Sequence, residues 1–397
     1  MLPAFRVRLT QGLAASLPQH IDVAAHERLR LRLLFGVALL KLFNFIGGAW
    51  DIQWHVAIGR DNLWIPPHLL VVFAFVSGLG LVLALIAYES GLAATGLELP
   101  HSLRIGPLRG PAAAFGVSAG YLVALASGGL DELWHEIFGI DATLWSPPHL
   151  LIMFATMIVD YSLMLGLAAS THRQGYEFKW NSPLLWSLVL TGAYAFESVN
   201  FQMGEAFIVA HRAGGAGLYG LLFPLLLGAF LPLPMMALIR LSQRTWIVLL
   251  VFALTLALQY VATGIAAVGF AILKPVSVID EYVRLNPDST AAMAREFAGL
   301  LGFNGLIGFH QAWTMSLSGP ALALVALFGR FNWLKKFPLL AAPVFSTAMV
   351  LSSFVWFEQV PALQNYPLSA WHVLLATVIS AAGGLLTGSL GLRLAGD

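Results

Sequence analysis

The sequence predicts an all-α, polytopic membrane protein built as a bundle of transmembrane helices. Its 397 residues are 58% hydrophobic and only 10% charged, whereas a typical soluble domain has about 25% charged residues. The apolar residues gather in runs of about 20, the length that a helix needs to cross the hydrocarbon core. The lipid bilayer is therefore the expected surroundings of most of the chain.

By that length criterion we expect about ten spans. They cover roughly residues 33–50, 68–88, 113–130, 149–169, 183–200, 214–239, 246–273, 308–329, 338–357 and 370–392. Fifteen Lys and Arg residues lie in the two terminal segments and the even-numbered loops, and five lie in the odd-numbered loops. Because basic loops remain in the cytoplasm, both termini are predicted to be cytoplasmic. We expect the membrane to be a bacterial inner membrane.

We divide the chain into three parts. Residues 1–32 form a cytoplasmic lead-in, residues 33–170 form a four-span half, and residues 171–397 form a six-span half. The second half contains a long outer segment near 275–305, in which an Asn-Pro-Asp-Ser turn at Asn286 precedes an Ala-rich run. Such a turn is typical of a helix start, so we expect an amphipathic segment at the outer surface.

Composition also limits the chemistry. The chain has no cysteine, which excludes disulfides, thiolate copper sites and iron–sulfur clusters. Metal ligands must then come from His, carboxylate, amide or Met side chains. A net charge of +1 without a basic arm gives no indication of a nucleic-acid partner.

One sequence pattern occurs twice, each time between two apolar runs. GGAWDIQWHVAIGRDNLWIPPHLL at 47–70 is followed by GGLDELWHEIFGIDATLWSPPHLL at 128–151. Each copy has an Asp, a His four residues later, a second Asp, and a further His directly after Pro-Pro. Ionisable groups at membrane depth are costly and commonly functional, so this repeat is the main candidate site.

The spacing within the first copy indicates metal binding. Asp51 and His55 are four residues apart and share one face of a helix. Pro66 and Pro67 suit the first turn of the next helix, so His68 enters at its start and points back toward the junction. One ion can collect all three side chains.

The second copy repeats the arrangement with Asp131, His135 and His149. Two imidazoles and a carboxylate suit copper, with zinc or iron as alternatives, and leave coordination positions open. Asp61 and Asp141 are predicted to orient a ligating imidazole or a neighbouring Arg.

Other interpretations of these residues remain open. The glycine pairs can serve close helix packing, and the tryptophans are expected to be interfacial anchors; they are Trp50, Trp54, Trp64, Trp134 and Trp145. Histidines 13 or 14 apart on one helix can ligate two haems. Here the Pro-Pro pair interrupts the helix between them, which disfavours haem.

The first copy resembles the C subunit of the copper-dependent membrane monooxygenases, the particulate methane and ammonia monooxygenases. That subunit has an Asp-x3-His-x12-His copper site in a similar context, matched here by Asp51, Trp54, His55, Arg60, Asp61, Pro66 and His68. A second site of that family, Asn-x3-His-x13-His, is matched by Asp131, His135 and His149, with Asp in place of Asn. The resemblance covers about residues 40–170. It implies copper at the outer, periplasmic face and oxidation of a small apolar substrate by dioxygen.

The rest of the chain has sparser polar residues. Those at outer span ends, which we give a supporting role, are Glu197, Glu205, His211, His310, Glu358 and His372. Glu358 and His372 are spaced like a degraded third copy of the repeat. Lys41, Asn44 and Asp160 lie inside spans, where polar side chains need partners that the sequence does not identify.

The leading hypothesis is a membrane-bound, copper-dependent, monooxygenase-like oxidoreductase with Asp51, His55 and His68 as its catalytic set. Other membrane subunits or a second copy of the chain are possible partners. The alternatives are a transporter or assembly factor that handles copper or another metal, and a non-catalytic subunit of a larger membrane oxidase complex.

Overall fold

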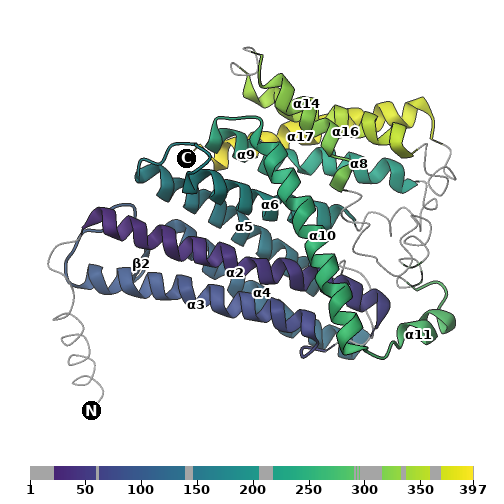
Figure 1. The fold of residues 1–397 in the computed structure, drawn as a ribbon, viewed down its shortest axis with the longest axis horizontal. Coiled ribbons are helices and arrows are strands. Elements are labelled where there is room, and N and C mark those ends of the chain that lie inside the picture. Colours follow the sequence, from purple (N-terminus) through teal and green to yellow (C-terminus); the bar gives the residue numbers. More distant parts are fainter. Residues whose placement is uncertain are drawn as a thin grey trace.

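The chain folds as a bundle of long helices with one short β-hairpin (Figure 1). The computed structural model describes residues 22–59, 62–138, 146–204, 218–289, 292, 295, 315–331, 337–357 and 368–396. Over these residues the predicted all-α class is confirmed.

The elements follow one another in a simple order. The α-helices are α2 (Val23–Ala57), α3 (Pro66–Ala94), α4 (Ala112–Phe138), α5 (Pro147–Arg173), α6 (Pro183–Gly204), α8 (Tyr219–Phe230), α9 (Pro232–Ser242), α10 (Ile247–Leu273), α11 (Ile279–Leu285), α14 (Gly319–Phe328), α16 (Ala341–Phe357) and α17 (Ala370–Leu394). The strands β1 (Leu103–Ile105) and β2 (Leu108–Gly110) pair antiparallel, and a 3-10 turn, η2 (Pro338–Leu340), precedes α16.

Eight helical segments among the described residues are long and apolar enough to cross a membrane. They correspond to α2, α3, α4, α5, the continuous pair α8 and α9, α10, η2 with α16, and α17. The predicted span at 183–200 forms α6, which is not among the eight, and only part of the span at 308–329 is described, as the short α14. The count of ten spans and the cytoplasmic termini therefore stay predictions.

The first four long helices form two hairpins, α2 with α3 and α4 with α5 (Figure 1). They share a core of buried apolar side chains that includes Leu34, Val117, Tyr121 and Leu163. A second core is built from buried side chains of α5, α6, α8, α9, α10, α14 and α16, and it includes Phe223. Helix α10 packs across α2 and joins the two groups of helices.

The junctions of both hairpins follow from local backbone chemistry. Gly59, with φ +76°, lies directly after the end of α2 in a conformation that favours glycine. Pro66 and Pro67 occupy the first two positions of α3, and Pro147 and Pro148 occupy those of α5. Proline suits these positions because the first helical N–H groups have no acceptor within the helix. The third residue of each helix is then a histidine.

The helix α11 lies within the segment predicted to be amphipathic. The Val278 N–H donates to the Ile58 carbonyl at 2.8 Å, and Ile279 packs against Gly59. Asn286 caps the end of α11, and a turn follows it. The start of α11 is therefore fixed beside the first hairpin junction.

A buried ionic cluster links α2, α3 and α5 at the end of the bundle away from these hairpin junctions. Arg30 is fully buried and donates to both carboxylate oxygens of Glu89, at 2.6 and 2.8 Å. It also pairs with Glu27, which accepts from Arg173 at 3.1 Å. His26 Nε2 lies 3.2 Å from Glu89. Such a cluster fixes the register of the three helices because each charge depends on the others.

We expect Arg30→Met to lower the free energy of unfolding by about 3–5 kcal/mol, because it leaves buried carboxylates without their cation. The matched variant Arg28→Met removes a half-exposed side chain whose ion-pair partner among the described residues is the exposed Asp22, so its effect should stay within about 0.5 kcal/mol. Denaturant titration of the purified protein in micelles measures both. Equal losses in the two variants would contradict the structural role of the cluster.

Candidate metal centre

The first copy of the repeat converges as its spacing predicts. Asp51 and His55 lie in the last two turns of α2, with His55 Nε2 3.6 Å from Asp51 Oδ1. His68, the third residue of α3, places its Nε2 3.1 Å from the same oxygen. Two consecutive helices therefore bring a carboxylate and two imidazoles to one point.

The second copy forms the same arrangement. His135 Nε2 and His149 Nε2 each lie 3.5 Å from Asp131 Oδ2. Asp131 and His135 lie near the end of α4, and His149 is the third residue of α5. We call Asp51, His55 and His68 the first triad, and Asp131, His135 and His149 the second triad.

The spacing of these atoms fits a common metal ion. Ligands about 2.1 Å from one ion at tetrahedral angles are about 3.4 Å apart. The carboxylate-to-imidazole distances in the triads range from 3.1 to 3.6 Å, and the ligand atoms of each triad all lie within 4.8 Å of one another. Both triads can thus hold an ion with little rearrangement.

A neighbour of each helix-starting histidine orients its ring. His68 Nδ1 lies 3.0 Å from the Asn62 carbonyl, and His149 Nδ1 lies 2.8 Å from the Ser146 hydroxyl. Each contact engages the nitrogen that faces away from the triad and aims Nε2 at the aspartate, as in known metal sites. The sequence predicts this role for Asp61 and Asp141, which lie outside the described residues. Ser146 could have been found from its place directly before Pro-Pro.

The two triads lie next to each other. The centroid of the His55 ring is 6.2 Å from that of His68, 6.1 Å from that of His135 and 6.1 Å from that of His149. The loop before α3 also contacts α4, since the Leu63 N–H donates to a Glu132 carboxylate oxygen at 3.2 Å. The two predicted sites therefore form one cluster of four imidazoles and two carboxylates.

Aromatic side chains support this cluster from the side of α10. Trp50 packs edge-to-face against both Trp54 and Phe270, and the Trp54 ring stacks on Phe270. Both are buried, so the expectation that they are interfacial anchors is wrong. The reason is that α10 crosses α2 here and covers them, whereas Trp64 in the junction loop is 75% exposed. The buried tryptophans hold the end of α2 that carries the first triad.

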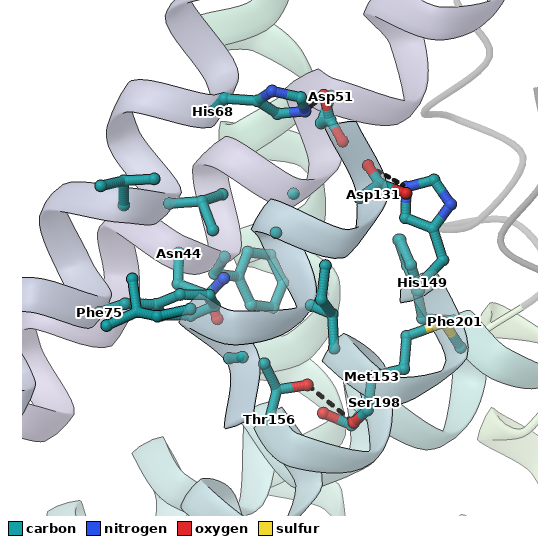
Figure 2. Close-up of a pocket in the computed structure, with 18 of the residues that line it drawn as sticks. Asn44, Asp51, His68, Phe75, Asp131, His149, Met153, Thr156, Ser198 and Phe201 are labelled. Atoms are coloured by element: carbon teal, nitrogen blue, oxygen red, sulfur yellow. Dashed lines mark hydrogen bonds and ion pairs between the residues drawn. The ribbon is translucent and has the colours of Figure 1, made fainter. Parts of the chain in front are cut away.

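A cavity of about 590 Å³ begins at the triads and extends into the bundle. Side chains from α2, α3, α4, α5 and α6 line it, and most are apolar. Figure 2 shows Asp51, His68, Asp131 and His149 at one end, with Thr156 and Ser198 at the other.

The far end of the cavity contains a buried ion pair. Lys41 Nζ lies 2.9 Å from Asp160 Oδ1 and donates to Asn44 Oδ1 at 3.1 Å. The Ser198 hydroxyl donates to Asp160 Oδ2 at 2.6 Å, and the Lys41 ammonium lies over the Tyr194 ring. These contacts supply the partners that the sequence left unidentified for the polar residues inside the spans.

The remaining predicted residues fall into two sets. Glu205, His211, His310 and Glu358 lie outside the described residues, so their roles stay predictions. Glu197 lines the cavity from α6 and accepts a hydrogen bond from Gln259 of α10. His372 is the third residue of α17, where its Nδ1 accepts from the Ser369 N–H at 3.0 Å and caps the helix.

Comparisons with protein-family models, curated proteins and solved structures found no match to this chain.

We expect Ser146→Ala to weaken metal binding at the second triad roughly 10–100-fold, because losing an orienting contact to a ligating histidine has effects of that size. Ser127→Ala is the matched control, since the Ser127 hydroxyl bonds only a carbonyl of its own helix. Competitive metal titration of the purified variants gives the affinities. Equal affinities in Ser146→Ala and the parent protein would show that this contact does not matter.

Gly269→Leu tests how α10 supports the first triad. A Cβ at Gly269 would lie 2.3 Å from the Trp50 ring, whereas nothing lies within 4 Å of a Cβ at Gly264 on the same helix. We expect Gly269→Leu to lower the free energy of unfolding by about 1–3 kcal/mol through overpacking. Gly264→Leu should leave it unchanged or raise it by up to about 1 kcal/mol, because leucine favours a helix more than glycine does. Thermal or denaturant unfolding distinguishes them; no difference would mean that α10 does not brace α2 at this point.

Proposed function

We propose that this chain is a membrane-bound, copper-dependent oxidoreductase, of the monooxygenase type, whose metal centre is the pair of adjacent triads. The observation that carries the proposal is the convergence of both Asp-His-His sets, with carboxylate-to-imidazole distances of 3.1–3.6 Å. Four imidazoles and two carboxylates in contact are a donor set suited to two neighbouring cations.

Electrostatics support occupation by cations. Asp51 and Asp131 lie within an apolar helix bundle, and burial of a carboxylate is costly without a compensating charge. Among the residues that the structure describes, the ion-pair partners of both are histidines rather than Lys or Arg. Neutral imidazoles leave the negative charge uncompensated, so a bound metal ion would stabilise this end of the bundle.

The resemblance of the first copy to the C subunit of the copper membrane monooxygenases favours copper over zinc or iron. Three protein ligands at each triad leave positions open, so bound copper would supply the binding and reduction of dioxygen. Transfer of one oxygen atom to a substrate C–H bond consumes one dioxygen, two electrons and two protons and releases water. The electrons must come from a separate two-electron reductant.

The residues of the chain have distinct roles in this proposal. The triads hold the metal, and the contacts from Asn62 and Ser146 keep His68 and His149 aimed at it. The apolar walls of the cavity exclude water and admit an apolar substrate from the surrounding lipid. Which side of the membrane the triads face, and whether this is a bacterial inner membrane, stay predictions.

Metal transport is the weaker alternative. A transport path for a cation would continue from the triads through the bundle. Here the cavity ends at the ion pair of Lys41 and Asp160, which has no net charge to attract a cation, and beyond it the helices pack through Leu34, Val117 and Leu163. A cavity that ends inside the bundle fits a reaction chamber better than a channel.

The experiment that tests the proposal is elemental analysis of the purified protein after copper loading. We expect about two copper ions per chain in the parent protein. His55→Ala should lose the most copper, because His55 is the ring that contacts the other three. His172→Ala is the control, since His172 lies at the other end of the bundle against the Leu241 carbonyl.

Copper-free protein after loading, or equal copper content in His55→Ala and the parent, would refute the metal centre. If both copper ions bind, electron paramagnetic resonance should report two coupled centres, because the triads are adjacent. Oxygen consumption that depends on an apolar substrate and on a reductant then tests turnover.

A further inference from the structure

Two glycines at equivalent positions of the repeat keep the cavity open directly below the triads. Gly48 and Gly128 each lie three residues before the aspartate of their copy, on the helix face that carries the carboxylate. Both line the cavity, and nothing lies within 4 Å of a Cβ built at either position. Glycine inside a helix costs about 1 kcal/mol relative to alanine. Here that cost is not offset by close helix packing.

Close packing at this level is provided by a different glycine. A Cβ on Gly47 would lie 2.9 Å from the Pro67 carbonyl and 2.8 Å from Val71, so Gly47 lets α2 approach α3. The expectation that the glycine pairs serve helix packing is therefore right for Gly47. Gly48 and Gly128 instead leave space where a side chain would fill the cavity.

The size of the cavity indicates what occupies it. About 590 Å³ lies within the range of roughly 300–1,000 Å³ that is typical of sites for ligands much larger than a gas molecule. Asn44 precedes Asp51 by seven residues on α2, and Thr156 follows His149 by seven residues on α5. At about 1.5 Å per residue, each lies about 10 Å deeper in the bundle than the triads. The occupant is therefore elongated.

The far end of the cavity offers hydrogen bonds to such an occupant. The Asn44 carbonyl oxygen accepts from Lys41, which leaves the amide N–H groups as donors at the cavity wall. The Thr156 and Ser198 hydroxyls donate to Met153 and Asp160 and retain lone pairs that can accept. A hydroxyl or carbonyl group meets these donors and acceptors, and the ion pair of Lys41 and Asp160 has no net charge to bind an ion.

We propose that the cavity binds a medium-chain aliphatic molecule with a hydroxyl or carbonyl group at the Asn44 end and its apolar end at the triads, and that Gly48 and Gly128 set the size limit. This inference deepens the proposed function, because it names the substrate class of the same site. Binding is measured without metal, so the two proposals can fail separately.

The test uses the full-length protein in phosphatidylcholine nanodiscs, stripped of metal. The probe is a medium-chain primary alcohol with a diazirine in mid-chain, and mass spectrometry maps the labelled residues after illumination. We expect adducts on residues that line the cavity, such as Val72, Leu125 and Ile152. Excess 1-octanol should compete with the probe roughly tenfold better than n-octane does. A tenfold difference in affinity corresponds to about one net hydrogen bond.

Variants separate the cavity from the lipid-facing surface. Gly128→Leu and, independently, Gly48→Leu should reduce cavity labelling at least about tenfold, because the new side chain occupies the binding space. Gly80→Leu, at an exposed position of α3 with nothing within 4 Å of a Cβ, should label like the parent. Asn44→Leu should abolish the preference for 1-octanol over n-octane.

Three results would overturn the inference. These are labelling confined to lipid-facing residues, equal labelling in the parent and both glycine variants, and equal cavity labelling by a phospholipid with the diazirine in its acyl chain. If the cavity is labelled as expected but the protein binds no copper, the metal proposal fails and this inference stands. If copper binds and the cavity is not labelled, only this inference fails.

Discussion

A carboxylate removed from water in an apolar helix bundle has a desolvation cost. One end of this molecule is arranged around two carboxylates, the buried Asp131 and the partly buried Asp51. Asp51 and Asp131 each lie near the end of a helix, and each is met by an imidazole from its own helix and one from the next. The proline pairs make this possible, because they start α3 and α5 so that the third residue faces back toward the carboxylate. The glycine after α2, the glycine that lets α2 approach α3, and the tryptophans beneath α10 all serve to keep these helix ends in place.

Because this unit occurs twice, the two helix junctions can combine into one larger cluster of ligands. Helix α3 packs on α4 and α2 packs on α5, which brings the two junctions together. His55 then contacts the rings of His68, His135 and His149, so one ligand of the first triad lies against both imidazoles of the second. Two neighbouring cations would offset two buried negative charges together, which links the stability of this end of the bundle to metal binding. The opposite end needs no metal, because the cluster around Arg30 neutralises its own carboxylates.

The parts of the fold and site that could be predicted are those that depend on local spacing. The spacing of four between Asp51 and His55, and a helix that begins with two prolines before His68, are enough to place three side chains together. The adjacency of the triads could not be predicted, because it depends on how hairpins pack, and apolar helix faces in lipid carry little directional information. The same limit applies to Lys41 and Asp160, which the sequence marks as buried polar residues but which meet only after α2 and α5 pack. Ser146 and Asn62 were missed because their roles arise from a hydroxyl and a backbone carbonyl at a helix start, which ordinary loop residues also provide.

The positions of Gly48 and Gly128 bear on why this bundle contains a cavity at all. In a membrane, small residues favour close packing where helices touch. These two glycines instead face open space, at the same position relative to the aspartate in both copies. Larger side chains would improve helix propensity and fill the void, so stability alone does not explain their absence. A chamber that is lined by apolar residues, bounded by metal-type ligands at one end and by a neutral polar group at the other, has the properties of a site for an amphiphilic molecule. The presence of glycine at these two positions, at a cost in stability, is therefore best explained by a ligand that occupies the open space.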